Sequence, residues 1–494
     1  MKQYFRLILL LLLPLYSIGQ IKKDHIEIIG KITGNLPDII EYTLPINGID
    51  YFGFTDSVQP DSLGNFQISL PLGKTSFIDL SNKNKSFGTL IAEPGMIYKI
   101  HINTEVKENQ FRVASKDEKG QLLYNQIPNR MSVGGHFEVE TKEYLQDSVP
   151  SNIKQQIKKS QEIELEGFKK LLKDKTISKN FYNLVRTDRE YFYKGIQGSV
   201  SFINLLNLPY KENKLSEEQY KELWSEIFES NPVTNPEILS SSWFFHYAEN
   251  YLRYKDLIIE GTTLTALSEI NKQGLTHTHN INNAKKYLSG PQLEYYFAAY
   301  IHFETINKNY EKELITLFEQ FKKEYPSSPY TPFLEPVIIP VLVFHKKQEE
   351  PLNEKIKFIP NSSAVNSVKE AIKGLYGKQF YVDIWATWCG PCKAEFKDNT
   401  KLYQLLKSKN ITIVYISIDK ESRENQWHDM IHFYNLEGIH IRANEKLNTD
   451  LINLYGNSSL AIPWHFLTDE NGNVIKKRLS GASEVENLEK QLNE

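Results

Sequence analysis

The sequence contains very little sulfur: its 494 residues include two cysteines and four methionines. The two cysteines, Cys389 and Cys392, stand in one short segment, so no other thiol could scramble their disulfide. Structural zinc takes four Cys or His ligands, and neither a second Cys pair nor a nearby His pair accompanies this segment. A disulfide across so short a loop would also restrict the unfolded chain very little. The pair therefore favours redox chemistry over a metal site or an inert disulfide, and we predict no metal and no cofactor.

The chain also lacks a strong charge of either sign and a second long apolar run. Its 58 Lys and Arg against 61 Asp and Glu give a net charge of -3, which argues against nucleic acid as a partner. After the first 20 residues, no segment has the apolar length of a transmembrane helix. The apolar share of 40% is ample for packed cores, and the length predicts about three domains.

Residues 1–19 have the pattern of a secretory signal peptide. Lys2 and Arg6 supply a positive start, Leu7 to Leu15 form an apolar core, and cleavage is expected before Gln20. No cysteine follows the apolar core, which excludes a lipoprotein anchor. An uncleaved membrane anchor is the alternative, but the apolar run is short for a bilayer. We expect an exported protein that is soluble after signal cleavage.

The remaining chain divides into four segments that differ in composition and pattern. Residues 21–118 alternate β-branched strands with turns and predict a β-rich, sandwich-like domain. Residues 119–345 carry charges and aromatics at helical spacing, interrupted by prolines, and predict an α-helical region. Residues 346–354 form a charged linker that contains proline. Residues 355–494 alternate strands with helices and end in a hairpin and a helix, which predicts an α/β domain.

One charge cluster in the helical region allows two interpretations. Arg186, Asp188, Arg189 and Glu190 lie close together between apolar helix faces. They could contact a neighbouring domain, or they could form local ion pairs on a solvated face. Exposed ion pairs are common and weak, so we favour the solvated face.

The cysteines stand where a predicted strand meets a predicted helix. Phe380 to Trp385 is rich in β-branched and aromatic residues, and Lys393 to Leu406 carries an apolar helical stripe. A helix N-terminus offers free N–H groups and a positive dipole, which lower the pKa of a thiol such as Cys389. Pro391 suits the first helical turn, where its missing N–H costs nothing.

Two motifs in this last region resemble the thioredoxin superfamily. Trp388 to Cys392 reads Trp-Cys-Gly-Pro-Cys, the thioredoxin active-site motif, and the wider stretch Trp385 to Phe396 is similar to the TlpA/ResA branch of envelope-facing bacterial thiol–disulfide proteins. Ile462 to Asp469, followed by Gly472, resembles the cis-proline strand and hairpin of the same family. The resemblance implies a thioredoxin fold over residues 355–494. It also implies the periplasm or cell envelope of a Gram-negative-type bacterium.

The resemblance also implies catalytic roles. The thiolate of Cys389, at the exposed end, attacks a substrate disulfide, and the more buried Cys392 resolves the mixed disulfide. Asp383 matches the buried aspartate of thioredoxin, and Glu395 matches the active-site glutamate of the TlpA/ResA branch. A carboxylate desolvated behind the disulfide would have a raised pKa, suited to moving the proton of Cys392. The alternative for Glu395 is an exposed helix residue.

On the substrate side, the resemblance implies a contact surface around the cysteines. This surface comprises Trp388, Gly390, Pro391, Ile462 and Pro463. Pro463 is expected to be cis, which leaves the backbone of Ile462 free to pair with a bound polypeptide.

Two positions depart from the family pattern. Tyr415 occupies the place of a lysine that thioredoxin sets near its buried aspartate. His465 is more polar than the residues common after the proline. It could tune substrate choice or the thiolate pKa, but we expect it to be exposed.

We therefore predict an exported thiol–disulfide oxidoreductase that reduces protein disulfides, because a Gly-Pro dipeptide accompanies the more reducing pairs of this superfamily. An apocytochrome c is one candidate substrate, and the electron donor would be a membrane thiol-transfer protein. The alternatives are a disulfide donor or isomerase, and an envelope scaffold in which the cysteine pair is a redox latch. Peroxide reduction is disfavoured, because Thr387 stands two positions before Cys389 where that chemistry needs three.

Overall fold

The computed structural model describes residues 22–46, 49–83, 85–106, 109–128, 138–147, 149–207, 217–230, 233–457 and 459–494. The predicted signal peptide, residues 1–19, lies outside the described residues. The chain packs as two compact units, one containing residues up to 262 together with 283–299, and the other containing 263–282 and 300–494. The predicted helical region therefore contributes to both units. Among the described residues, no helix combines the length and the apolar character needed to cross a membrane.

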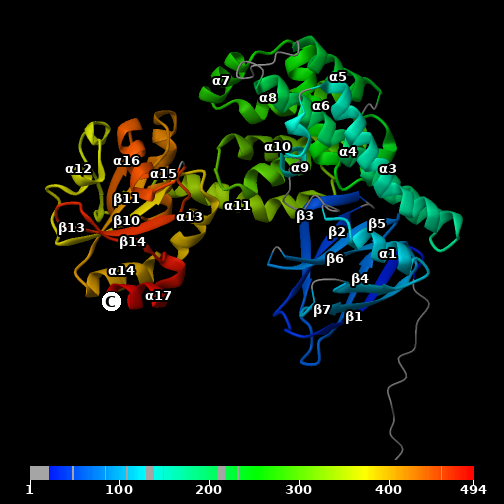
Figure 1. Ribbon diagram of the computed structural model, residues 1–494, viewed down its shortest axis with the longest axis horizontal. Helices are drawn as coiled ribbons and strands as arrows, with labels where there is room; N and C mark the ends of the chain where they lie inside the picture. The colour runs from blue at the N-terminus through cyan, green and yellow to red at the C-terminus, as the bar shows by residue number, and fades with distance from the viewer. Residues whose placement is uncertain are drawn as a thin grey trace, which may run out of the picture. The chain divides into compact units, whose positions relative to one another are not determined.

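The first unit begins with a sheet-rich region, as the strand and turn pattern predicts (blue in Figure 1). Two four-stranded sheets have the orders β4-β1-β7-β8 and β3-β2-β5-β6. Alternate residues of these strands point into one shared apolar core, which Ile28, Leu80 and Ile100 illustrate. The strands are β1 His25–Thr33, β2 Ile40–Ile46, β3 Ile49–Val58, β4 Asn65–Pro71, β5 Ser76–Asn82, β6 Lys85–Ala92, β7 Ile97–Asn103 and β8 Phe111–Ala114.

Helices follow, and the two longest contain the segments 153–173 and 181–206, whose apolar residues have helical spacing. The segment 237–258 also has helical spacing, but its helix is divided. Pro236 and the cap at Asn235 start a 3-10 turn, and the end of the segment forms a π turn. The elements are α1 Glu118–Asn125, α2 Glu138–Thr141, α3 Pro150–Lys173, α4 Lys179–Asn207, α5 Glu217–Ser230, η3 Pro236–Ser240, α6 Phe244–Tyr254, η4 Lys255–Ile259 and α9 Gly290–Ile306.

The charge cluster of α4 is only partly solvated. Arg186 and Glu190 are partly exposed and form a local ion pair of 3.3 Å, as expected. The expectation of a solvated face is wrong for Asp188 and Arg189, which are buried. Asp188 is 0% exposed and accepts hydrogen bonds from the backbone N–H and hydroxyl of Ser242, both at 2.8 Å. Burial raises the pKa of Asp188 to about 6, although Arg189 and the serine hydrogen bonds oppose that rise. Arg189, also 0% exposed, pairs with Glu164 at 2.5 Å. The reason is tertiary: α3 and α6 both contact α4 and leave these residues no solvated side.

The second unit is built on a six-stranded sheet of order β14-β13-β10-β11-β12-β9. Helices α14 and α17 lie on one face and α12 and α16 on the other (Figure 1). The strands are β9 Ile356–Phe358, β10 Gln379–Trp385, β11 Thr412–Ser417, β12 Gly438–Arg442, β13 Trp464–Asp469 and β14 Val474–Leu479. The helices are α12 Val368–Ile372, α13 Gly390–Glu395, α14 Asn399–Ser408, α15 Glu424–Tyr434, α16 Glu445–Tyr455 and α17 Val485–Asn493.

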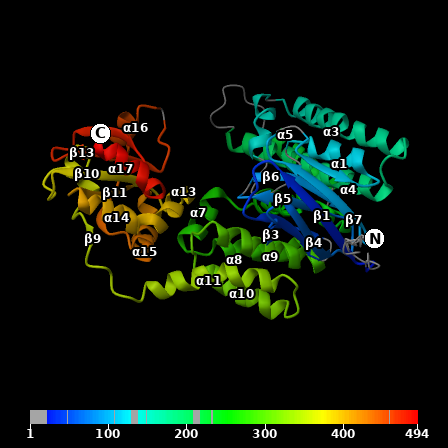
Figure 2. The ribbon, with the colours of Figure 1, turned by 90° about the horizontal axis from the view of Figure 1, so that it is seen from below.

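Four helices from the middle of the chain lie wholly or mostly in this unit. They are α7 Leu264–Lys272, α8 Thr276–Tyr287, α10 Glu313–Glu324 and α11 Thr331–Lys347. Helices α10 and α11 pack against each other (Figure 2), and α11 also contacts α15. Helix α11 extends to Lys347 despite two internal prolines, so the first residues of the predicted linker are helical.

The α/β pattern of the last domain is predicted well, with two differences. The helix predicted after the cysteines is interrupted by a 3-10 turn at Phe396–Asp398, which divides it into α13 and α14. Helix α16 was not predicted, although Asn444 caps its start and Gly456 ends it in a left-handed conformation. Strand β10 lies at the centre of the sheet, and all but its first residue are buried. This buried strand carries Asp383 toward the cysteines.

Candidate active site

The two cysteines form a disulfide at the start of α13, directly after the end of β10. Cys389 is the N-cap residue, and its sulfur accepts a hydrogen bond of 3.1 Å from the backbone N–H of Cys392. Cys389 is the more accessible cysteine, as predicted, but at 4% against 1% exposure both are buried. The neighbouring Trp388 is 51% exposed and, with Gly390 and Pro391, forms the accessible part of this segment.

The Ile462–Pro463 peptide bond is cis, which confirms the prediction for this bond. Both residues are half-buried and directly precede β13. Strand β13 runs antiparallel to β10, with Trp464 opposite Ile384. The proline segment therefore enters the sheet beside the end of β10 that leads to the cysteines.

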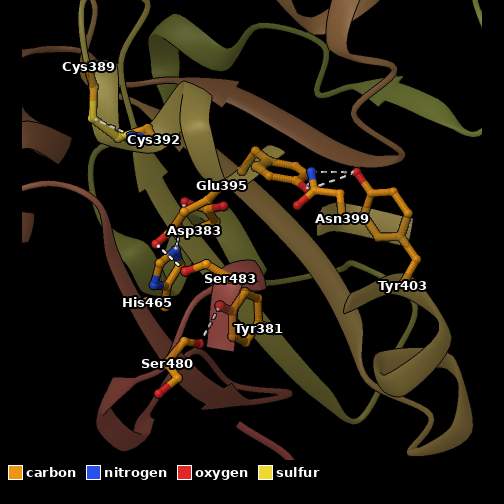
Figure 3. A network of polar contacts seen from close by, with 11 residues as sticks. Tyr381, Asp383, Cys389, Cys392, Glu395, Asn399, Tyr403, His465, Ser480 and Ser483 are labelled. Carbon is orange, nitrogen blue, oxygen red and sulfur yellow. Dashed lines mark hydrogen bonds and ion pairs between the residues drawn. A yellow bond between two sulfur atoms is a disulfide. The ribbon is translucent and has the colours of Figure 1, made fainter. Parts of the chain in front are cut away.

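Two carboxylates converge on one histidine behind the disulfide (Figure 3). Asp383 is 4% exposed and lies directly opposite His465 in the pairing of β10 with β13. The Nε2 atom of His465 lies 3.5 Å from Oδ1 of Asp383 and 3.3 Å from Oε2 of Glu395. The Glu395 side chain is 20% exposed, so its alternative as an exposed helix residue is wrong.

His465 is 4% exposed, which overturns the expectation that it is exposed. The first five residues of β13 are all buried, because helices cover both faces of the sheet and leave this strand no solvated side. Burial disfavours a charged imidazole, but the attraction and hydrogen bonding of Asp383 and Glu395 outweigh it and raise the pKa of His465 to about 10. His465 is therefore protonated, and it is the positively charged partner of the two carboxylates.

Neutral groups surround the charged cluster. The ring of Tyr381 stacks on His465 with centroids 5.6 Å apart, and its hydroxyl donates to the carbonyl of Ser480 at 2.9 Å. The hydroxyl of Ser483 donates to Glu395 at 3.4 Å. Burial raises the pKa of Tyr381 well above its ordinary value, so its hydroxyl keeps its proton. These contacts hold the cluster in place from β10 and from the segment that follows β14.

On the opposite side of Asp383, β11 presents a tyrosine. Tyr415 pairs with Asp383 in the register of β10 and β11, at the position where the family pattern sets a lysine. Its hydroxyl lies 2.9 Å from that of Tyr403, and Asn399 donates to it at 3.1 Å. Burial raises the pKa of Tyr415 well above its usual range. The cation beside Asp383 therefore comes from β13 and not from β11.

A lysine that the sequence does not single out secures the active-site helix. Lys393, directly after Cys392, is 5% exposed, and its Nζ donates to the carbonyls of Asn307 and Lys308 at 3.0 and 3.1 Å. Burial lowers the pKa of Lys393 to about 8. No signal in the sequence could have found this contact, because its acceptors are backbone carbonyls on a distant loop.

Comparisons with known proteins agree with this arrangement. Residues 360–492 match the Redoxin family model. The chain is 29% identical over 121 residues to thiol-disulfide oxidoreductase ResA of Bacillus thuringiensis, and 32% identical over 121 residues to ResA of Bacillus cereus. Each alignment covers 24% of this chain and 65% of the relative. The chain therefore spans slightly less than two thirds of the length of these curated relatives.

Solved structures also match part of the chain. A thiol:disulfide interchange protein from Bacteroides sp. is 27% identical, with coverage of 24% of this chain and 75% of that one and a TM-score of 0.21. The thioredoxin domain of a thiol-disulfide oxidoreductase from Bacteroides vulgatus is 26% identical, with coverage of 24% and 78% and a TM-score of 0.20.

The C-terminal region is a thioredoxin-like domain. Its sheet order, its Cys-Gly-Pro-Cys disulfide at a helix start and the adjoining cis proline define that class. More specifically, residues 360–492 match the Redoxin model and the chain is similar to ResA proteins, while a sheet-rich region and a helical region precede this domain.

Proposed function

We propose that this chain is a thiol–disulfide oxidoreductase that reduces disulfides of protein substrates. The observation that supports it best is the Cys389–Cys392 disulfide with Asp383 and Glu395 converging behind it. A redox cysteine pair needs an attacking thiolate, a resolving thiol and a base for the resolving thiol. Cys389 and Cys392 would fill the first two roles, and Asp383 and Glu395 are the candidates for the base.

The proposed reaction proceeds in two exchanges. The thiolate of Cys389 attacks one sulfur of the substrate disulfide, which forms a mixed disulfide and releases the other substrate sulfur as a thiolate. Cys392 then loses its proton to a carboxylate, and its thiolate attacks the sulfur of Cys389. The second substrate sulfur leaves with the electron pair, and the Cys389–Cys392 disulfide forms again. Two electrons pass to the substrate, and a donor must return them for the next cycle.

We propose that the substrate binds across the exposed segment around the cysteines. Trp388, Gly390 and Pro391 supply accessible surface beside Cys389. Ile462 and Pro463, which are half-buried and precede the strand paired with β10, would extend this surface. The backbone of Ile462 would pair with an extended substrate segment.

Export is part of the proposal, on the evidence of the signal-like residues 1–19. The protein would act in the periplasm or cell envelope, reduce substrates such as an apocytochrome c, and receive electrons from a membrane thiol-transfer protein. The two sheets of the N-terminal region would form a sandwich domain that, with the helices, holds the redox domain near its partners.

The reduction potential of the full chain tests the direction of the reaction. We expect equilibration with dithiothreitol to give a potential near that of thioredoxin, about −270 mV. A value near that of the strong oxidant DsbA, about −120 mV, would contradict reduction and indicate a disulfide donor.

Substrate capture tests the roles of the two cysteines. We expect Cys392→Ser to accumulate a mixed disulfide with protein substrates, because the resolving thiol is gone. The matched variant Cys389→Ser should accumulate none. Equal capture by both variants would contradict the assignment of Cys389 as the attacking thiol.

A further inference from the structure

We propose that His465 is a positioning residue that keeps Asp383 and Glu395 ionised together behind the disulfide, so that this pair can accept the proton of Cys392. The inference rests on the proposed disulfide-exchange function and deepens it. The proton acceptor would then be a three-residue unit, Asp383, Glu395 and His465, with one shared cation, and not a single carboxylate.

The geometry brings one ring nitrogen between two carboxylates from different elements. Asp383 comes from β10, Glu395 from α13 and His465 from β13, and the Nε2 atom lies 3.5 and 3.3 Å from the two carboxylates. Figure 3 draws His465 on the far side of the carboxylates from the cysteines. His465 therefore acts through the carboxylates and does not touch the reacting sulfurs.

The charges explain why the cation is needed. Two carboxylates held close together in a buried site repel each other, and one of them would normally retain a proton. A carboxylic acid that already holds its proton cannot accept another from Cys392. With an imidazolium between them, both carboxylates can stay ionised, and the three groups carry a combined charge of about −1.

The other described groups that face His465 are uncharged. Tyr381 from β10 stacks on its ring, and Tyr415 from β11 lies across Asp383. From the segment after β14, Ser483 reaches Glu395, and the backbone of Gly481 covers the cluster. The charge of His465 is therefore set by the two carboxylates.

The backbone at Gly481 lies in close contact with the side chains of His465 and Glu395. A Cβ atom at Gly481 would lie 2.6 Å from Cε1 of His465 and closer still to Oε2 of Glu395. The backbone thus closes over the histidine and the glutamate. Asp383 and His465 have side chains 5% exposed, whereas Glu395 is 20% exposed and offers the route by which the proton reaches solvent.

The step balances as a proton transfer followed by a disulfide exchange. The S–H bond of Cys392 breaks and its proton goes to the carboxylate pair. The sulfur of Cys392 then bonds to the sulfur of Cys389, while the bond from Cys389 to the substrate sulfur breaks. The cysteine pair is oxidised and the substrate is reduced. His465 keeps its own proton throughout.

A mixed disulfide with thionitrobenzoate isolates this step in the full-length reduced protein. Ellman's reagent converts Cys389 to the mixed disulfide, and the attack of Cys392 then releases a second thionitrobenzoate, whose absorbance gives the rate. We compare wild type, His465→Phe and His440→Phe between about pH 5 and 9, the range over which a carboxylate of raised pKa would titrate.

His440→Phe is the matched control. His440 is also fully buried and stacks on a tyrosine, with its ring centroid 5.0 Å from that of Tyr415. Its Nε2 atom contacts the carbonyl of Leu436 instead of a carboxylate. The two variants thus remove equivalent rings that differ in their carboxylate contacts.

We expect His465→Phe to slow the second release about 10- to 100-fold at neutral pH. This is less than the roughly 100- to 10,000-fold typical for losing a general base, because the two carboxylates remain. The rate should recover as the pH rises, because the carboxylate that keeps a proton then ionises. His440→Phe should stay within about twofold of wild type with an unchanged pH profile, since no base is affected.

Wild-type rates and pH profile in His465→Phe overturn the proposal, as does equal slowing by both variants. If His465→Phe fails to fold, His465→Gln gives the same test with a neutral polar side chain. An oxidising reduction potential together with a slow, pH-dependent His465→Phe variant would refute the reductive direction and leave the role of His465 standing.

Discussion

Two histidine–tyrosine stacks in the same sheet have similar geometry, but one histidine is a cation and the other is neutral. His465 stacks on Tyr381 at an interplanar angle of 16°, and His440 stacks on Tyr415 at 2°. Burial lowers the pKa of His440 to about 4, whereas the pKa of His465 is raised to about 10. Burial acts on both in the same direction. The difference teaches that carboxylate neighbours, and not the stack or the depth, decide the protonation state of a buried histidine.

Replacing Asp383, the carboxylate opposite His465, should have the largest effect on the pKa difference between His465 and His440. In Asp383→Asn, burial dominates, so the pKa of His465 should fall by several units toward that of His440. Release of thionitrobenzoate should slow about 100-fold, as expected when a general base is lost. Ring-nitrogen NMR of His465 and the release assay measure the two effects. An unchanged pKa of His465 in this variant would show that Asp383 does not stabilise the protonated imidazole.

Glu395→Gln should have a smaller effect of the same kind. Glu395 is 20% exposed, so solvent screens its interaction with His465 more than that of Asp383. We expect the pKa of His465 to fall less than in Asp383→Asn and the release rate to fall about tenfold. A larger effect than that of Asp383→Asn would make Glu395 the principal partner of His465.

The pH dependence of stability should separate the two histidines. The folded pKa of His465 is raised to about 10, so its stabilisation is fully present below its unfolded pKa, about 6.5, and is lost as the pH rises toward 10. The folded pKa of His440 is lowered to about 4, so its contribution is present above about 6.5 and is lost as the pH falls toward 4.

Urea unfolding of wild type, His465→Phe and His440→Phe checks these windows. The free-energy difference between wild type and His465→Phe should shrink by at most about 1.4 kcal/mol per pH unit between pH 6.5 and 10. The difference for His440→Phe should change on the acid side instead. The same window for both variants would contradict the assigned charges.

Gly481→Ala should perturb the cluster without removing any of its ionisable groups. The added methyl would press directly on the carboxylate of Glu395, so Glu395 or the backbone must move. We expect release of thionitrobenzoate to slow about threefold and the pKa of His465 to fall, because displacing one carboxylate weakens its attraction. Gly73→Ala is the control, since nothing lies within 4 Å of a Cβ there. Equal behaviour of the two variants would show that the fit at Gly481 is loose.

Short-range patterns in the sequence predicted the chemistry of this region. The strand before the cysteines was expected from local residues, whereas the family resemblance implied the cis bond at Pro463 and the buried place of Asp383. The structure agrees with all three. His465 was expected to be exposed and is buried. In its strand, polar His465 stands between apolar Trp464 and Phe466, a local alternation that favours a solvated face, whereas the structure covers both faces.

The cluster at Asp188 in the helical region shows the same limit. Four charged residues among positions 186–190 of one helix predict a solvated face, yet Asp188 and Arg189 are fully buried. Their partners, Ser242 and Glu164, lie far away in the sequence. A single helix cannot indicate that neighbours will cover all its sides, because burial depends on contacts between distant segments.

The sequence by itself determined which atoms can exchange a disulfide, because the Cys-Gly-Pro-Cys motif, its strand and its helix are local features. Only the tertiary structure decided where the proton-accepting groups and their cation lie. Asp383, Glu395 and His465 come from three elements separated along the chain, and they meet because β10 pairs with β13 while α13 packs beside them. The charge of His465 follows from that meeting, since in a buried site the nearest charged groups decide which protonation state is stable.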